Sequence, residues 1–261
     1  VAVQMDPLES INISGDSTFA IMLGAQARGY SLYHYLADDL TYQEGRLYAG
    51  AHEVSVQRVP GDHFRLGAFK ILDLGRHVDG VLMRQDPPFD LGYITATHLL
   101  ERIQDETLVV NDPAAVRNAP EKVWVLDFAR FMSPTMITRS LGAARKFAEE
   151  HGEIVVKPLH GNAGKAVFKV GRDGANLAPL MELFNASYRE PHVVQAFLPE
   201  VAEGDKRIVL IEGEIAGAIN RRPKSGDIRS NLAAGGTAEA TDLTDTEREI
   251  CAALSPELMR R

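Results

Sequence analysis

The first two apolar segments of the chain enclose a helix-forming segment, and this order restricts the fold more than any other feature. "VAVQMD" is typical of a buried strand, and "SLYHYL" of a second one. Between them we expect a helix that is capped near Asp16 or Ser17 and ends at Gly29. A strand, helix, strand connection joins parallel strands by a right-handed crossover. The sequence therefore predicts a parallel sheet at the start of the chain.

The next segments extend this α/β unit. "EGRLYAGAHEVSVQRV" predicts a hairpin that turns at Glu44 and Gly45. "DGVLMR" is a further strand that leads to a helix through "ITATHLLERIQ", and "TLVVN" is another strand. Asp112 is the expected cap of the following helix, with Pro113 as its first residue. We assign residues 1–120 to one N-terminal α/β domain.

After "MITRS" the strands are closer together in sequence. Ser140 is the expected cap of a helix that Gly152 ends, and "EIVVKPL" and "AVFKVG" are strands on either side of "HGNAG". "LAPLMELFNASY" predicts a helix and "HVVQAFL" a strand, which completes a small α+β domain over 121–198.

The remaining residues, 199–261, are assigned to a third domain with a loop over 220–238. "KRIVLIEGEIAGAIN" predicts a hairpin that turns at Glu212 and Gly213. Thr244 and Glu247 have the spacing of a capping box for the last helix.

The composition of the chain excludes several classes of function and binding partner. The 261 residues are 45% hydrophobic, as expected for a chain with a sizeable core, and the net charge of −8 argues against general affinity for nucleic acid or anionic membranes. Cys251 is the single cysteine, which we interpret as a small core residue on a helix. No apolar run approaches the ~20 residues that span a bilayer, so we expect a cytoplasmic protein. Both ends look cut, and we expect further residues on each side.

The segment "VVKPLHGNAGKAVFKV" is the strongest local candidate for a phosphate site. Gly161 and Gly164 let backbone amides approach phosphate oxygens, and Lys157 can add a charge-assisted hydrogen bond. A hairpin with a loose turn explains the same residues equally well. The segment is not a Walker loop, because no helix-opening Gly-Lys-Ser or Gly-Lys-Thr follows.

A second candidate lies where "EGDKRIVLIEGE" enters a strand. Alternation places Asp205 and Arg207 on one face and Lys206 on the other. In a cleft, the acid suits ribose hydroxyls and the arginine suits phosphate. An exposed loop edge is the alternative.

A third candidate is the cationic, glycine-containing stretch "INRRPKSGDIRSNLAAGGTAEA". It holds the following residues: Arg221, Arg222, Lys224, Gly226, Arg229, Asn231, Gly235 and Gly236. A long irregular connection in a compact domain is usually either disordered or a lid over an active site, and charge and glycine content do not decide between them.

Arg84 ends the strand "VLMR", and ligands of open α/β sheets bind at such carboxyl ends. A bidentate arginine there suits a substrate carboxylate, and a solvated strand end is the alternative. The eight histidines show no pair at metal-ligand spacing, and a Gly-x-Ser-x-Gly elbow is absent, which weakens zinc and hydrolase interpretations.

Six segments in this order resemble the bacterial glutathione synthetases of the ATP-grasp superfamily: "MDPLESINISGDSTFAIMLGAQARGY", "VLMRQDPPFD", "VVNDPAAVRNAPEK", "VVKPLHGNAG", "EGDKRIVLIEGE" and "RSNLAAGGTAEA". The resemblance covers nearly the whole chain. It implies α/β and α+β architecture, that is, an ATP-grasp fold with an N-terminal Rossmann-like parallel-sheet domain, a central lid domain and a partial C-terminal domain.

The resemblance implies an ATP-dependent carboxylate-amine ligase that joins γ-glutamylcysteine to glycine through an acyl phosphate, with ATP and Mg²⁺ as cofactors. The residues implied for ATP are Lys122, Lys157, Gly161, Asn162, Gly164, Gln195, Ala196, Phe197, Leu198, Asp205 and Arg207. Those implied for catalysis are Arg207, Arg222 and Asn231, and those for substrate are Asp16, Ser17, Arg84, Ser230, Gly235 and Gly236.

Two departures from the family pattern matter. Ala163 stands where the small loop commonly has a further glycine, and Lys165 follows it. The family's magnesium ligands are expected beyond Arg261, so this chain holds no metal ligand and is expected to be weak or inactive by itself.

The alternatives are another ATP-grasp carboxylate-amine ligase and a synapsin-like ATP-binding module that does no ligation. The resemblance also implies a homo-oligomer, a tetramer, and the net charge and hydropathy predict no nucleic acid or membrane partner.

Overall fold

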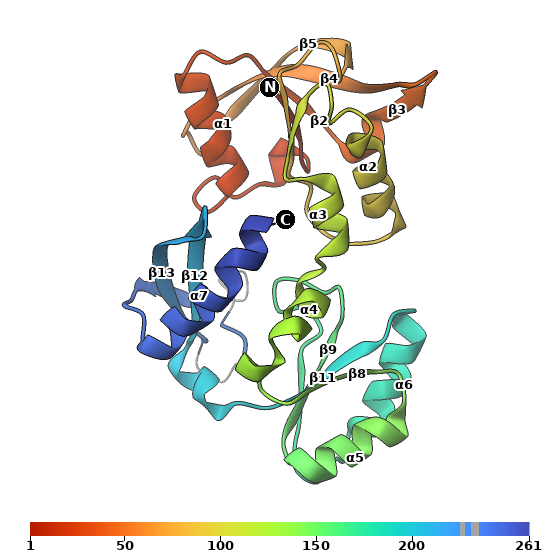
Figure 1. Cartoon of the computed structure of the whole chain (residues 1–261), viewed down its shortest axis with the longest axis vertical. Helices are drawn as coiled ribbons and strands as arrows, with labels where there is room; N and C mark the ends of the chain where they lie inside the picture. The colour runs from red at the N-terminus through yellow and green to blue at the C-terminus, as the bar shows by residue number, and fades with distance from the viewer. Residues whose placement is uncertain (225–227, 231–234, 261) are drawn as a thin grey trace. The chain divides into compact units, whose positions relative to one another are not determined.

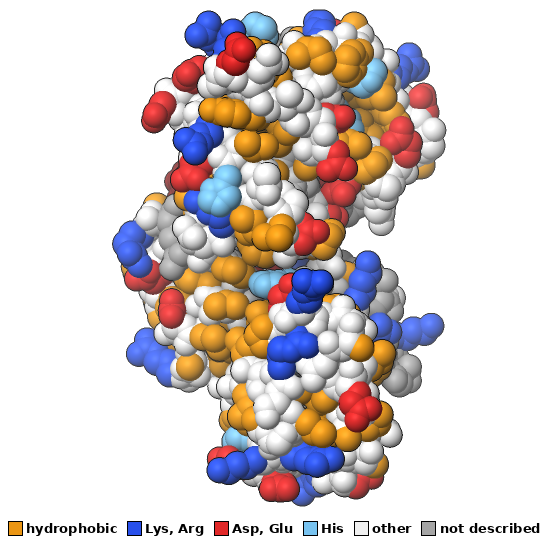
Figure 2. All heavy atoms as spheres, turned by 90° about the vertical axis from the view of Figure 1, so that its right-hand side faces the viewer, with side chains coloured by type: hydrophobic (Ala, Val, Ile, Leu, Met, Phe, Trp, Pro, Cys, Tyr) orange, Lys and Arg blue, Asp and Glu red, His pale blue; other side chains and the backbone are white. Residues whose placement is uncertain are grey.

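The computed structural model describes residues 1–224, 228–230 and 235–260. The chain divides into two compact units, Val1–Pro120 and Glu121–Arg261 (Figure 1). The further division of the second unit at residue 198 stays a prediction. Figure 2 shows acidic and basic side chains interspersed with apolar ones over the face that it draws.

The first unit is built on a seven-stranded sheet of order β3-β4-β2-β1-β6-β7, with β5 paired to β4. Its strands are β1 (Ala2–Gln4), β2 (Leu32–Tyr35), β3 (Leu40–Gln43), β4 (Arg46–Val56), β5 (Phe64–Asp73), β6 (Gly80–Met83) and β7 (Leu108–Val110). Its helices are α1 (Ser17–Ala27), α2 (Leu91–Glu101) and α3 (Pro113–Asn118), with short 3-10 turns at Leu8–Ser10 and Ala37–Asp39. Strands β1, β2, β6 and β7 pair in parallel, which confirms the predicted parallel pairing, whereas β3, β4 and β5 extend the sheet by antiparallel pairing.

Alternation along β1 creates two cores on the two faces of this sheet. Ala2 packs in one cluster with Leu100 of α2, and Val3 packs in the other with Phe19 of α1. The two helices therefore cover opposite faces (Figure 1). Because β1 and β6 are parallel, their carboxyl ends lie at the same end of the sheet, and Arg84 directly follows β6 there.

The structure confirms the helix cap and the hairpin turn that the sequence predicts in this unit. Asp16 caps α1 by accepting a hydrogen bond from Phe19 N at 2.7 Å. Glu44 and Gly45 turn the β3-β4 hairpin with φ of 51° and 82°. Strand β5 was not predicted from the sequence. It lies at the sheet edge with most of its residues exposed, so it lacks the alternation that identifies a half-buried strand.

The second unit contains two sheets, of order β10-β9-β11-β8 and β12-β13-β14. Its strands are β8 (Thr135–Thr138), β9 (Ile154–Pro158), β10 (Phe168–Val170), β11 (His192–Ala196), β12 (Asp205–Ile211), β13 (Glu214–Arg222) and β14 (Thr237–Ala240). Its helices are α4 (Glu121–Trp124), α5 (Leu141–His151), α6 (Leu177–Ser187) and α7 (Asp245–Arg260), with 3-10 segments at Val125–Phe131 and Pro199–Glu203. No helix in the described part of the chain is long and apolar enough to cross a bilayer.

The four-stranded sheet uses one face for its core. Val156 and Val194 pack with Phe147 of α5 and Phe184 of α6. Because side chains alternate along a strand, residues 155, 157 and 195 are directed to the other face. That face is the one that lines the cavity described below.

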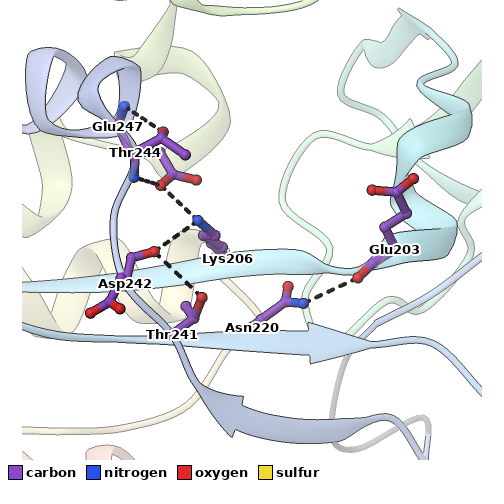
Figure 3. A network of polar contacts seen from close by, with 7 residues as sticks. All are labelled: Glu203, Lys206, Asn220, Thr241, Asp242, Thr244 and Glu247. Carbon is purple, nitrogen blue, oxygen red and sulfur yellow. Dashed lines mark hydrogen bonds and ion pairs between the residues drawn. The ribbon is translucent and has the colours of Figure 1, made fainter.

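A polar network joins the three-stranded sheet to α7 (Figure 3). Lys206 Nζ donates to Asp242 O at 2.9 Å and to Glu247 Oε2 at 2.8 Å. Thr244 N donates to Glu247 Oε2 at 2.7 Å, and Glu247 N donates to Thr244 Oγ1 at 3.3 Å, which confirms the capping box. Cys251 is buried on α7, as predicted, and burial raises the pKa of its thiol.

We expect Glu247→Gln to lower the free energy of unfolding of the second unit by about 1 kcal/mol at neutral pH. Burial by itself would raise the pKa of Glu247, but hydrogen bonds from Lys206 and Thr244 outweigh it and lower the pKa below its ordinary 4.5. The contribution is therefore complete above that pH and is lost as the pH falls through the lowered pKa.

Urea unfolding followed through the emission of Trp124, the chain's single tryptophan, measures this difference in the unit concerned. Glu249→Gln, an exposed position of the same helix, is the control. A difference between Glu247→Gln and the parent that is unchanged well below pH 4.5 would contradict the assignment.

Gly236 lies where the chain returns to β14, and it has no room for a side chain. A Cβ at this position would meet Ser230 O at 2.6 Å and Arg222 O at 2.9 Å, both of them backbone atoms. We expect Gly236→Ala to destabilise the second unit by about 1–3 kcal/mol, the usual cost of overpacking.

The same unfolding measurement tests this expectation. Gly217→Ala on β13 is the matched control, because a Cβ there meets nothing within 4 Å. Equal stability of the two variants would show that the 222–236 connection adjusts without cost.

Candidate active site

A cavity of about 400 Å³ in the second unit brings together seven of the residues that the family resemblance implied for ATP or substrate. These are Lys157, Gln195, Ala196, Phe197, Leu198, Asp205 and Ser230. They come from β9, from the end of β11, from the start of β12 and from the connection before β14. Val155, Val201 and Ile228 add apolar walls to the lining, and Ser133, Glu200 and Arg229 add polar groups. The volume, and the combination of apolar walls with polar groups, are typical of a small-molecule site.

Lys157 is a partly buried cation of this cavity, which Arg229 also lines. Its Nζ donates to Gln195 Oε1 at 2.9 Å. Burial lowers the pKa of Lys157, and the nearby charge of Lys122 lowers it further. An anion placed at this ammonium would offset both effects, because it favours the charged form.

Lys122 does not line the cavity but is linked to the glycine-containing loop. Its Nζ donates to Gly161 O at 2.6 Å and to Glu121 Oε1 at 2.5 Å. In the same loop Ala163 and Gly164 have φ of 52° and 73°. The left-handed conformation at Ala163 explains why glycine suits this position and shows that alanine accepts it here.

The end of β11 carries residues that the resemblance implied for ATP, and two of its backbone N–H groups already have partners. The N–H of Ala196 donates to Pro134 O at 2.9 Å, and the N–H of Phe197 donates to Glu153 O at 2.9 Å. Both donors are therefore engaged within the protein. Base recognition by this segment would depend on its carbonyl oxygens and on the N–H of Leu198.

Asp205 and Arg207 differ in their surroundings, although alternation places them on one face. Asp205 lines the cavity, and its two carboxylate oxygens accept from Arg221 Nε at 2.8 Å and Nη2 at 2.7 Å. Arg207 is exposed and does not line the cavity. From the sequence, Arg221 was only one of the cations of the third candidate stretch, whereas the β12-β13 register places it directly opposite Asp205.

The connection between β13 and β14 is described in part. Arg222 Nε donates to Glu239 Oε1 at 3.0 Å at an exposed strand end. The Ser230 side chain is 3% exposed, and its hydroxyl has no hydrogen-bond partner within the described ranges. Gly235 has a φ of 90°. The predicted residues Gly226 and Asn231 lie outside the described residues.

In the first unit, the predicted substrate residues Asp16, Ser17 and Arg84 line one pocket of about 150 Å³. Arg84 Nη2 donates to Ser17 Oγ at 2.9 Å, and its Nε donates to Thr18 Oγ1 at 3.0 Å. These bonds hold the guanidinium at the start of α1.

Two acidic residues of this pocket, Asp6 and Asp86, were missed by the sequence analysis. Asp6 follows β1 and Asp86 follows β6. Because the carboxyl ends of parallel strands lie at the same end of a sheet, their positions in the sequence could have identified both residues. Burial raises the pKa of Asp86, and the charges of Asp6 and Asp16 raise it further, while Arg84 opposes them. The pocket thus combines one arginine with several carboxylates, a set that suits a ligand with both a carboxylate and an amine.

Within 1–224, 228–230 and 235–260, no three side chains of His, Cys, Asp or Glu gather as a metal site would require. The described residues therefore hold no complete set of protein ligands for a metal ion.

Two solved structures with the same fold are a D-cycloserine synthetase, DcsG, and the D-alanyl-alanine synthetase A of Vibrio cholerae. The first has a TM-score of 0.67 at 19% identity and covers 99% of this chain and 81% of its own. The second has a TM-score of 0.58 at 13% identity and covers 99% and 80%. At these identities the likeness shows the ATP-grasp fold alone, which confirms the expected fold class.

Sequence relatives are much more similar. The glutathione synthetase of Rhodopseudomonas palustris is 53% identical over 261 residues, which are 100% of this chain and 83% of that protein. The glutathione synthetase of Agrobacterium fabrum is 51% identical and matched over 82% of its length. The family models for the prokaryotic glutathione synthetase N-terminal domain and ATP-grasp domain match residues 1–117 and 121–261. The chain belongs to the prokaryotic glutathione synthetase family of ATP-grasp ligases.

Proposed function

We propose that this protein joins γ-glutamylcysteine to glycine with ATP, through an acyl phosphate, and releases glutathione, ADP and phosphate. The observation that carries the proposal is the cavity of the second unit, where Lys157, Asp205 and residues 195–198 meet in a member of this family. ATP is the proposed occupant of that cavity. Magnesium is proposed as its companion ion, with ligands outside the described residues.

Lys157 and Lys122 are proposed to bind the phosphates. Lys157 hydrogen-bonds to a neutral amide, so its charge remains to stabilise the negative charge that develops during phosphoryl transfer. Lys122 is already bonded to the carbonyl of Gly161, so a phosphate at its ammonium would lie beside the small loop. Gly161, Asn162 and Gly164 are proposed to cover that phosphate with backbone N–H groups.

Residues 195–198 are proposed to hold the adenine, and Asp205 the ribose. The bidentate contact with Arg221 fixes the Asp205 carboxylate but leaves each oxygen a further lone pair for a hydroxyl. Arg207 is proposed for the transferred phosphoryl group. Its exposure in this structure means that it contributes only if the nucleotide reaches beyond the cavity lining.

The pocket of the first unit is proposed to bind γ-glutamylcysteine. Arg84 is held with its guanidinium oriented, which suits bidentate recognition of a carboxylate. The 220–238 loop is proposed to close over ATP and the acyl phosphate. Its proposed substrate and catalytic residues are Ser230, Asn231, Gly235, Gly236 and Arg222. Closure would exclude water from an intermediate that water hydrolyses.

The first test measures ADP release by the full-length protein. We expect release that requires γ-glutamylcysteine and glycine together, with glutathione formed in equal amount. Release no higher with both substrates than with neither would contradict the proposal. Release that depends on a different acceptor would indicate another ATP-grasp ligase, and nucleotide binding without turnover would indicate a synapsin-like module.

The second test concerns Arg222. We expect Arg222→Ala to lower kcat on the order of a hundredfold, the scale of removing a donor to a developing charge, while the Kd of ATP changes far less. Glu239→Gln is the matched control, because it removes the ion pair of Arg222 but leaves the guanidinium in place. Unchanged turnover in Arg222→Ala would leave Arg222 as a solvated strand end.

A further inference from the structure

A chain of side-chain hydrogen bonds leads from β8 across β11 to Lys157. Strand β11 lies between β9 and β8, and Gln195 is opposite both Thr135 on β8 and Val155 on β9. Lys157 is two residues beyond Val155, so it is the diagonal neighbour of Gln195 on the same face of the sheet. The pairing register therefore brings Thr135, Gln195 and Lys157 into one row.

The direction of each hydrogen bond in this row follows from the first one. Thr135 Oγ1 donates its single proton to Ser133 O at 2.8 Å. The oxygen can then only accept, and it accepts from Gln195 Nε2 at 2.7 Å. This contact turns the amide of Gln195 so that Oε1 faces Lys157, whose Nζ donates to it at 2.9 Å.

The amide holds the ammonium without neutralising it. Within the described part of the chain Lys157 has no ion pair, whereas Lys122 and Lys206 each contact a glutamate. A carboxylate at position 195 would compete with phosphate for Lys157, and a side chain without an acceptor would leave a long, flexible lysine unrestrained. A glutamine whose orientation is fixed avoids both outcomes.

We propose that Thr135, acting through Gln195, is a positioning residue that holds the Lys157 ammonium in the cavity ready for a phosphate group. The inference rests on the proposed function, in which Lys157 binds the phosphates of ATP. Neither Thr135 nor the side chain of Gln195 has to touch the nucleotide for this role. The adenine contact proposed for Gln195 involves its backbone and is separate.

The experiment compares Thr135→Val with Thr135→Ser in the full-length protein. Valine keeps the shape of threonine but removes the hydroxyl, and serine keeps the hydroxyl. We expect Thr135→Val to raise the Kd of ATP, measured by titration calorimetry, and its KM about fivefold, the factor for one lost hydrogen bond. The KM values of the other two substrates should stay unchanged, and Thr135→Ser should stay within about twofold of the parent.

Two further variants separate positioning from simple structural damage. In a Lys157→Met background, Thr135→Val should cause no additional loss of ATP affinity, because the group that it positions is gone. Gln195→Glu should weaken ATP binding more than Thr135→Val does, because the new carboxylate pairs with Lys157 and cannot donate to Thr135. Emission of Trp124 during urea unfolding checks that each variant is folded.

The outcomes distinguish the inference from the proposed function. If Thr135→Val and Thr135→Ser bind ATP like the parent, or weaken binding equally, the positioning role is wrong. An equal loss in the parent and Lys157→Met backgrounds would also overturn it. If Lys157→Met itself binds ATP like the parent, the phosphate role of Lys157 fails. If Lys157→Met binds ATP too weakly to titrate, the comparison of Thr135→Val with Thr135→Ser decides whether Thr135 has the positioning role.

Discussion

The antiparallel register of β11 between β8 and β9 is the constraint on which the candidate nucleotide site depends. It places Val194 and Val156 against α5 and α6 and directs Gln195 and Lys157 to the cavity. Because the side-chain period of a strand is two, a slip of one residue would exchange core and site residues. The packing of the buried apolar face therefore also fixes the position of the polar face. Both the stability of this sheet and the geometry of the candidate site depend on the same strand register.

Three cations of the second unit, Lys206, Arg221 and Lys157, differ in the kind of partner that they contact. Lys206 and Arg221 contact the carboxylates of Glu247 and Asp205, and these pairs connect elements of the fold. Lys157 contacts a neutral amide instead, and burial lowers its pKa. A buried cation that keeps its charge without a carboxylate is poorly compensated in the free protein. An anionic ligand supplies the compensation, which makes this position suited to binding rather than to stability.

Local signals in the sequence predicted local structure well. The caps at Asp16, Ser140 and Thr244 and the turn at Glu212 and Gly213 depend on residues within a few positions of each other, and the structure confirms them. Pairing partners were harder to predict. Strand β5 has an irregular exposure pattern, and the partner of Asp205 is Arg221, sixteen positions away and across a hairpin. Such contacts depend on register, which single residues do not encode.

The sequence by itself determined most of the strands and helices, the parallel pairing at the start of the first sheet and the family, because caps, turns and ordered motifs are properties of short segments. Only the tertiary structure decided which candidates meet. It brought Lys157, Asp205 and Ser230 to one cavity, left Arg207 exposed, and placed Gly236 against two backbone carbonyls that leave no room for a side chain. The physical reason is that side-chain direction, burial and hydrogen-bond geometry are set by neighbours distant in the chain.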